Sequence, residues 1–347
     1  LHHFLLSFFL AGLAKGECRP FVIDGQQVGL ISQNVMEQLF RYPEVFCIKD
    51  AEQGKQQVGL ISQNVMEQLF RYPEVFCIKD AEQGKQNIVE LNPAFRDYTE
   101  RSEQVDRVLK EFRSQGLFVA LKGWRNECYE VRGFTGSLMK MERSATSLFG
   151  VRNYGVTING YIQHPSKGLC IWLQQRADTK QTWPGKWDNM VSGGLSVGYG
   201  IHETAVKEAA EEASVPERLL KNLISAGCVS CFFESERGLF PNTEFVFDLE
   251  LPEDFVPENS DGEVQDFELL SANECLERLY SPEFKTTSCP VVVDFMIRHG
   301  IITPENEKNF TQVVELLHVP LQSLYTYRSP PQTNGLTNSN GFKNGRI

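Results

Sequence analysis

Apolar and polar residues alternate over several short stretches in the second half of the chain, and this pattern predicts β-strands. A turn at residues 164–168 (HPSKG) separates the first two stretches. The expected strands are residues 154–163, 169–175, 245–251 and 267–270. Apolar residues at helical spacing predict helices over residues 272–279, 291–299 and 309–317. We therefore expect strands and helices to share one core in this half.

The first half contains an internal repeat, because residues 27–56 recur without one substitution as residues 57–86. Each copy is predicted to form a serine-capped helix followed by a strand, and in the first copy Ser32 precedes the helix. Two copies are too few for a solenoid, which needs about three. A working pair would also be expected to differ, since two copies cannot have identical surroundings. We interpret the repeat as a recent exon duplication or an assembly error.

Beyond the repeat, residues 102–114 have apolar positions at helical spacing and are followed by Gly116. Residues 117–121 and 127–131 are predicted to form a hairpin around residues 122–123. We expect a small α+β domain over residues 17–150 that contains the duplication. Nothing in it looks catalytic. A second domain is expected over residues 151–326.

The two ends of the chain differ from the rest. Residues 4–14 (FLLSFFLAGLA) are apolar but too few to span a bilayer, so residues 1–16 are either an apolar leader or a misread start. Residues 327–347 are rich in Pro, Asn, Gly, Ser and Thr, and a disordered tail is expected there.

A glycine-rich turn over residues 193–200 leads directly into a predicted short helix. At about 100° per residue, three carboxylates fall on one side of this helix, and an apolar stripe falls on the other. The carboxylates are Glu208, Glu211 and Glu212, and the stripe is Val206, Ala209, Ala210 and Ala213. Three carboxylates within one turn repel one another unless a cation lies among them, and a hard divalent ion such as Mg²⁺ binds through oxygen ligands.

The turn itself favours an anion beside that cation. Glycine lets the backbone come close to a ligand, and the free N–H groups at a helix start favour negative charge. Gly193 and Gly194 are therefore candidate substrate-binding residues. Arg176, Lys180 and Lys186 are the cations best placed by sequence to meet phosphate oxygens near the turn. The pattern predicts a site for a metal-bound pyrophosphate, although an acidic helical turn is also typical of a solvated surface.

Other aromatic and sulfur side chains allow two interpretations. Trp183 and Trp187 either stack on a heteroaromatic ring or pack beneath the loop that carries them. Cys228 and Cys231 lie three apart in a predicted strand, so they face opposite sides and cannot share a ligand. We expect both to be ordinary buried cysteines.

The composition narrows the possible partners. The formal net charge is −11 with no basic cluster, which argues against a nucleic-acid duplex or a membrane surface as a partner. The odd count of nine cysteines in a long chain predicts a reducing, intracellular compartment, and we expect a cytoplasmic protein. The sequence carries no signal for an oligomeric state.

The turn and helix resemble the signature box of the Nudix hydrolases, G-x5-E-x7-R-E-U-x-E-E-x-G-U, where U is apolar. The chain departs from the box at the mid-box Glu (Tyr199), the Arg (Lys207) and the second Gly (Ser214). The matching positions are Gly193, Glu208, Ala209, Glu211, Glu212 and Val215. The resemblance implies a Nudix α/β/α sandwich with a mixed sheet, preceded by the small α+β domain. It also implies that Glu208, Glu211 and Glu212 hold Mg²⁺, or Mn²⁺ in its place.

Nudix enzymes often have a Glu just before the last strand that binds a second metal or serves as the base. Glu263 resembles that residue in position and in its E-V-x-x-F-E-L context, although a loop glutamate is otherwise simply solvated. Glu208 and Glu263 are thus the two candidates for the base that takes a proton from water. The predicted reaction is hydrolysis of a small-molecule diphosphate to a monophosphate and phosphate.

Residues 18–46 and 117–132 are similar to the domain that precedes one Nudix subgroup, which has plant and fungal members and is related to thiamine pyrophosphokinase. That resemblance implies thiamine diphosphate or its oxidised and damaged forms as the substrate. Oxidised nucleoside diphosphates such as 8-oxo-dGDP are the alternative. Two alternatives of other classes are an isopentenyl-diphosphate isomerase, which shares the fold, and a non-catalytic diphosphate-binding module, favoured by Tyr199, Lys207 and Ser214.

Overall fold

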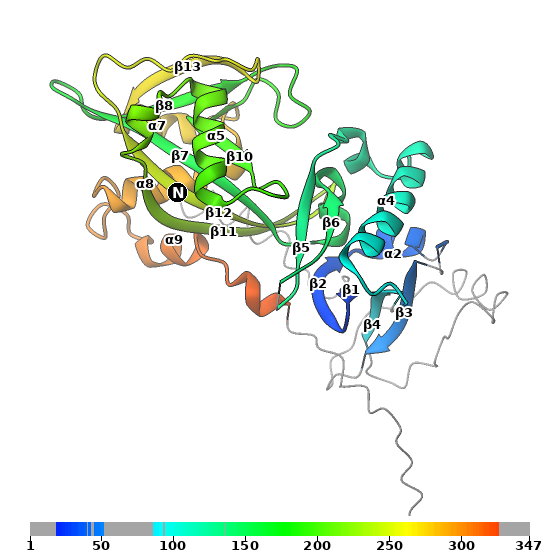
Figure 1. The fold of residues 1–347 in the computed structure, drawn as a ribbon. Helices are drawn as coiled ribbons and strands as arrows, with labels where there is room; N and C mark the ends of the chain where they lie inside the picture. Colours follow the sequence, from blue (N-terminus) through cyan, green and yellow to red (C-terminus); the bar gives the residue numbers. More distant parts are fainter. Residues whose placement is uncertain are drawn as a thin grey trace, which may run out of the picture.

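The computed structural model describes residues 19–39, 41–42, 45–51, 86–92, 94–134 and 136–325. The leader, the tail and the second copy of the repeat up to residue 85 lie outside these residues, so the expectations for them are not addressed. The described elements form two lobes, one coloured blue to cyan and one green to orange in Figure 1. Within the described residues, no helix has the length and apolar character needed to span a membrane.

The first lobe is built on a four-stranded sheet with the strand order β2-β1-β4-β3 (Figure 1). Its strands are β1 (Arg19–Ile23), β2 (Gln26–Ile31), β3 (Phe46–Ala51) and β4 (Gln86–Leu91). β1 and β4 run parallel, and the other pairs are antiparallel. The predicted Ser-capped helix and the following strand of the first repeat copy correspond to α2 (Gln33–Leu39) and β3.

Helix α4 (Tyr98–Ser114) includes the predicted helix over residues 102–114 and begins four residues earlier. It starts there because Asp97 caps it: the Asp97 side chain accepts a hydrogen bond from the Glu100 backbone N–H at 2.8 Å. Val105, Val108 and Phe112 are fully buried against the lobe core, as their helical spacing predicts.

The hairpin expected over residues 117–131 is wrong in its first arm. That arm is a 3₁₀ helix, η1 (Val119–Gly123), because Ala120 and Leu121 are both buried and consecutive buried positions do not fit an alternating strand. The hairpin instead joins β5 (Cys128–Arg132) to β6 (Ser137–Glu142). Its turn is closed by the Gly133 N–H, which donates to the Gly136 carbonyl at 2.9 Å. A second 3₁₀ segment, η2 (Arg143–Phe149), follows.

The second lobe contains a seven-stranded mixed sheet, as expected from the sequence. Its main order is β11-β12-β7-β8-β13, with β10 on β7 and β9 on β8. β7 and β12 are parallel, whereas the other neighbours are antiparallel. The strands are β7 (Asn153–His164), β8 (Gly168–Arg176), β9 (Trp187–Asn189), β10 (Val191–Gly194), β11 (Ile224–Ser235), β12 (Gly238–Glu250) and β13 (Val264–Ser271).

Helices cover both faces of this sheet. Residues of α5 (Ile201–Ala213) pack with β7 and β10 in one core cluster, and residues of α7 (Ala272–Leu279), α8 (Cys289–Arg298) and α9 (Phe310–Leu316) pack in another. The short segments are α6 (Glu217–Leu220), η3 (Thr286–Ser288) and η4 (Leu321–Leu324). The α/β/α layering follows, because each face of the sheet has its own apolar core.

Two expectations about single faces need correction. On α5 the buried side is formed by Ala205, Ala209 and Ala213 together with Glu212, whereas Ala210 is exposed. Cys231 is buried but Cys228 is exposed on β11, because residues three apart on a strand point to opposite faces. The predicted separation of the two thiols is therefore confirmed, and the predicted burial of Cys228 is wrong.

Candidate active site

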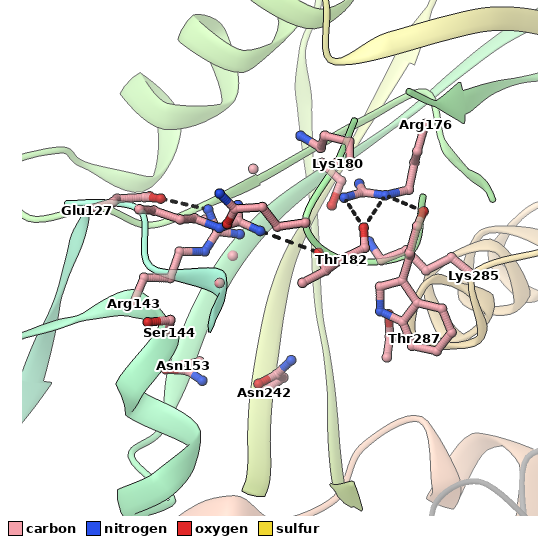
Figure 2. Close-up of a pocket in the computed structure, with 18 of the residues that line it drawn as sticks. Glu127, Arg143, Ser144, Asn153, Arg176, Lys180, Thr182, Asn242, Lys285 and Thr287 are labelled. Carbon is pink, nitrogen blue, oxygen red and sulfur yellow. Dashed lines mark hydrogen bonds and ion pairs between the residues drawn. The ribbon is translucent and has the colours of Figure 1, made fainter. Parts of the chain in front are cut away.

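A cavity of about 1180 Å³ lies between α5, the strands beneath it, and the β5–η2 part of the first lobe (Figure 2). Its lining is rich in charge of both signs. The carboxyl groups include Glu127, Glu208, Glu211, Glu244 and Glu263, and the cations include Arg125, Arg143, Arg176, Lys180, Lys207 and Lys285. The two lobes thus face the same space with side chains that are far apart in the sequence.

The glycine turn allows two very close approaches at the cavity wall. A Cβ atom on Gly193 would lie 2.3 Å from Cγ of Glu208, and one on Gly194 would lie 1.7 Å from the hydroxyl oxygen of Tyr129. Any side chain larger than hydrogen at either glycine would therefore collide with Glu208 or Tyr129. Both glycines line the cavity, as predicted, and they let α5 and β5 approach the turn.

Glu208 and Glu211 line the cavity, whereas Glu212 does not. The Lys207 ammonium lies between the first two, 3.3 Å from Oε1 of Glu208 and 2.7 Å from Oε2 of Glu211. Burial raises the pKa of Glu208, and Lys207 opposes that shift. In this structure the cation that relieves the repulsion between these carboxylates is a side chain of the same helix.

Glu212 lies beneath the glycine turn and is 1% exposed. Its carboxylate accepts hydrogen bonds from the Ser192 backbone N–H at 2.9 Å and from the Gln174 amide at 3.2 Å. Burial raises the pKa of Glu212 to about 8, since two neutral donors compensate only part of the lost hydration.

Among the residues that the structure describes, no three His, Cys, Asp or Glu side chains are gathered as ligands for a metal ion. The chemistry of the donors still fits a hard divalent cation, because Glu208, Glu211 and Glu263 all present carboxylate oxygens to one cavity. Glu208 and Glu211 already share one positive charge, that of Lys207. A divalent ion would replace or join that ammonium.

Glu263, the second candidate base, lies in the loop before β13 and lines the same cavity as Glu208 and Glu211. It accepts a hydrogen bond from the Lys180 ammonium (Figure 2 labels Lys180). Burial raises the pKa of Glu263, but Lys180 outweighs that effect, and the pKa lies below its usual value. Glu263 is therefore ionised and able to accept a proton near neutral pH.

The three cations predicted near the turn are placed differently. Lys180 reaches the cavity beside Glu263. Arg176 lines the cavity, but its guanidinium donates hydrogen bonds to protein groups: to the Asp188 carboxylate at 3.1 Å and to the carbonyls of Thr182 and Trp183. Lys186 is not among the lining residues, and its ammonium donates to the Pro282 carbonyl at 2.7 Å.

The two tryptophans also separate. Trp187 is 9% exposed and packs in the core beneath Arg278, whose guanidinium carbon lies 4.7 Å from the ring centroid. Trp183 lines the cavity at a left-handed backbone position with φ of 54°. Of the two, only Trp183 is placed to meet a ligand.

Several lining residues were not expected from the sequence. Glu127, Tyr129 and Arg143 come from the half in which nothing looked catalytic. Arg125 lies there too, and its sequence position allows contact with a ligand, although a surface role is the favoured interpretation. On the floor of the cavity, Asn242 and Glu244 stand two apart on β12 and share a face. The available signal was polar residues within an otherwise aromatic strand, residues 239–247 (LFPNTEFVF).

The floor also holds polar atoms without partners. Within the described part of the chain, Oγ of Ser144 and the Oδ1 atoms of Asn153 and Asn242 are buried and accept no hydrogen bond (Figure 2). Such atoms are costly unless a ligand or water satisfies them. These oxygens lie just below the cavity surface, so they mark a polar floor rather than contacts that are open to a ligand.

Comparison with known protein families agrees with this layout. The NUDIX domain model matches residues 154–288, and a domain of unknown function (DUF4743) matches residues 1–54 and 53–153. The second match begins within the first copy of the repeat. The chain belongs to the Nudix hydrolase family, whose members hydrolyse phosphorus-containing anhydrides and generally use divalent metals.

Three curated relatives span most of the chain. Nudix hydrolase 24, chloroplastic, from Arabidopsis thaliana is 33% identical over 300 residues, which are 85% of this chain and 72% of that protein. Nudix hydrolase 20, chloroplastic, from the same plant is 32% identical over 294 residues, 84% of this chain and 70% of that protein. The uncharacterized protein YJR142W of Saccharomyces cerevisiae is 37% identical over 242 residues, 66% of this chain and 71% of that protein.

Proposed function

We propose that this protein is a Mg²⁺-dependent diphosphatase that converts an X-linked diphosphate to X-monophosphate and phosphate, with Mn²⁺ able to replace Mg²⁺. The observation that carries this proposal is the meeting of Glu208, Glu211 and Glu263 with Lys180 in one cavity. Carboxylates supply ligands for a hard cation, and the ammonium supplies a donor for phosphate oxygens. We keep residues 17–150 and 151–326 as the two proposed domains.

Each side chain has a proposed role. Glu208 and Glu211 hold the cation from the cavity side. Glu212, the third glutamate to which the resemblance assigns this role, is buried behind the glycine turn and supports the turn through the Ser192 N–H. When bound, the cation neutralises diphosphate charge and lowers the pKa of water. Glu263 or Glu208 takes the proton from the attacking water. Gly193 and Gly194 let Glu208 and Tyr129 come close to the turn that borders the diphosphate, and Lys180 orients the diphosphate.

The organic group X is proposed to be that of thiamine diphosphate or its oxidised and damaged forms, so that the enzyme removes faulty cofactor. The resemblance of residues 18–46 and 117–132 to the thiamine-pyrophosphokinase-related subgroup supports this choice. The polar lining that includes Asn153 and Asn242 is compatible with a nitrogen-rich ring. It is equally compatible with 8-oxo-dGDP, the second candidate, because oxidised guanine is also such a ring.

A reducing compartment such as the cytoplasm fits this role. Six cysteines of the described residues are free thiols: Cys128, Cys170, Cys228, Cys231, Cys275 and Cys289. Such thiols are typical of proteins kept in a reducing environment.

One assay tests the proposal. The purified protein is given Mg²⁺ with thiamine diphosphate, its oxo-analogue, 8-oxo-dGDP or isopentenyl diphosphate, and phosphate release and product identity are measured. We expect the highest kcat/KM for oxidised thiamine diphosphate and loss of activity in Glu211→Gln. Release that survives Glu211→Gln would indicate a contaminant. No release from any diphosphate would favour a binding module, and isomerised product from isopentenyl diphosphate would favour the isomerase.

A further inference from the structure

Two arginines of the first lobe project into the cavity that contains the acidic face of α5. Arg125 lies in the loop after η1, and Arg143 is the first residue of η2. Both belong to the segment that matches a domain of unknown function. We call Arg125 and Arg143 the arginine pair.

Arg125 has little compensation for its charge. Its backbone N–H donates to Glu142 at 3.0 Å, which fixes the chain, while its guanidinium donates to the neutral Thr182 hydroxyl at 3.4 Å. Across the described residues, its guanidinium has no carboxylate within ion-pair distance. Burial, and then the neighbouring positive charge of Arg143, lower the pKa of Arg125. A partly buried guanidinium next to another cation is unfavourable until an anion joins them.

Arg143 is held in a fixed position. Its Nη1 atom lies 2.8 Å from Oε2 of Glu127, and its guanidinium carbon lies 5.3 Å from the centroid of the Tyr129 ring (Figure 2 labels Arg143 and Glu127). The Ser196 hydroxyl donates to the other oxygen of Glu127. Since Ser196 belongs to the glycine turn and Glu127 to the first lobe, this chain of contacts fixes Arg143 relative to α5.

The arginine pair is close to the acidic groups of the second lobe. Arg143 lies within electrostatic reach of Glu208, and Arg125 within reach of Glu263. The positive groups of one lobe therefore border the proposed cation site of the other. A diphosphate has negative oxygens on two linked phosphorus atoms, so it can offer one phosphate to each of these two charged regions.

We propose that Arg125 and Arg143 form an anion-binding site for the diphosphate group, so that the first lobe is part of the active site. This inference rests on the proposed function, because it assigns part of the same substrate. Guanidinium N–H groups form a planar fork that matches phosphate oxygens in pairs. The arginine pair takes the phosphate that is directed away from α5, and the α5 glutamates serve the phosphate nearest the cation.

Binding of a non-hydrolysable diphosphate tests the site without catalysis. Methylenediphosphonate is titrated into the full chain by calorimetry in the presence of EDTA, so that divalent ions do not contribute. We expect Arg125→Ala to weaken binding at least about tenfold, as loss of charge-assisted hydrogen bonds predicts. Arg125→Lys keeps the charge but loses the fork, and we expect a smaller loss. Arg96→Ala, an exposed arginine of the same lobe, is the matched control and should bind as the unmodified protein does.

Arg143→Lys provides a second variant that retains the charge facing Glu127, with unfolding temperature measured for every variant. If the unmodified protein does not bind methylenediphosphonate, or Arg125→Ala binds it equally well, the anion site is wrong. Hydrolysis is then assayed separately with Mg²⁺, where we expect Arg125→Ala to raise KM about tenfold. Binding that depends on Arg125 in a protein that hydrolyses no diphosphate would sink the proposed function and keep the anion site. Hydrolysis with an unchanged KM in Arg125→Ala would support the proposed function and contradict the anion site.

Discussion

Two acidic side chains of the second lobe, one fully buried and one at the cavity wall, have opposite pKa shifts. Asp188 on β9 is 0% exposed, and the groups around it are Arg176, Lys285 and Ser288, which together we call the Asp188 cluster. Burial raises the pKa of Asp188, but Lys285 and Arg176 outweigh it and hold the pKa at about 2. On β12, burial raises the pKa of Glu244 to about 7, and a 3.4 Å hydrogen bond from Thr157 offsets little of that shift.

The difference shows which carboxylate charge is compensated by other groups of the protein and which is not. The Asp188 cluster joins β8, β9 and the start of α8, so its charges are balanced by parts of the fold. Glu244 lines the cavity, and among the described residues no lysine or arginine lies within ion-pair distance of it, so Lys285 opposes the shift only from further away. Incomplete compensation is therefore found at the carboxyl group that lines the cavity, and complete compensation at Asp188, which lies behind the lining although Arg176 and Lys285 reach the cavity.

Breaking the Asp188 cluster should have the largest effect. Asp188→Asn leaves Arg176 and Lys285 buried without a negative partner, and we expect a loss of about 3–5 kcal/mol in the free energy of unfolding. Urea denaturation measures this loss. Asp254→Asn, at an exposed site, should change the free energy by less than about 0.5 kcal/mol. Equal effects of the two substitutions would contradict a structural role for the cluster.

Removing a cavity carboxylate should instead affect activity. We expect Glu208→Gln to lower kcat about 10²-fold or more, since it removes a proposed cation ligand and base, with the fold retained. Steady-state kinetics with the best diphosphate and thermal unfolding measure the two properties. Glu263→Gln is compared in the same assay to distinguish the two candidate bases. The substitution that causes the larger loss of kcat, and whose loss excess Mg²⁺ does not restore, identifies the base.

The pKa of Glu244 predicts a dependence of stability on pH. The folded chain keeps a proton that the unfolded chain loses above about 4.5, so the free energy of unfolding decreases as pH rises from about 4.5 to 7. The Asp188 contribution has the opposite sign and lies lower, since stability is lost as pH falls from 3.8 toward 2. Glu244→Gln should remove a decrease on the order of 1 kcal/mol, after allowance for partial solvent screening. Urea midpoints at pH 5 and pH 8 measure it, and an unchanged difference in Glu244→Gln would contradict the assignment.

The smallest effect is expected at Glu203, which lies on α5 outside the cavity. Its side chain accepts a hydrogen bond from the Gly200 N–H at 3.2 Å, and glutamine retains an acceptor there. We expect Glu203→Gln to change activity less than twofold and stability by less than about 0.5 kcal/mol. A large loss of kcat would show that Glu203 serves as the missing mid-box glutamate.

Helices and strands of the second lobe were largely predictable, because their apolar periodicity is local. The strands over residues 154–163 and 169–175 and the helix over residues 272–279 match β7, β8 and α7 within one or two residues. Gly193 and the α5 glutamates were predictable for the same reason, since the turn and helix that carry them are contiguous. The first arm of the hairpin predicted over residues 117–131 was not, because the apolar run of residues 117–121 (LFVAL) resembles a strand in the sequence but folds as η1.

By itself, the sequence determined the Nudix fold, the acidic face of α5 and the general chemistry of the family. Only the tertiary structure decided how those carboxylates divide, with Glu208 and Glu211 sharing Lys207 in the cavity and Glu212 buried behind it. It also brought Arg125 and Arg143 to the same space and committed Arg176 to Asp188. The physical reason is that spacing along a helix fixes which side chains share a face. Burial and charge partners depend on segments that meet only when the two lobes fold together.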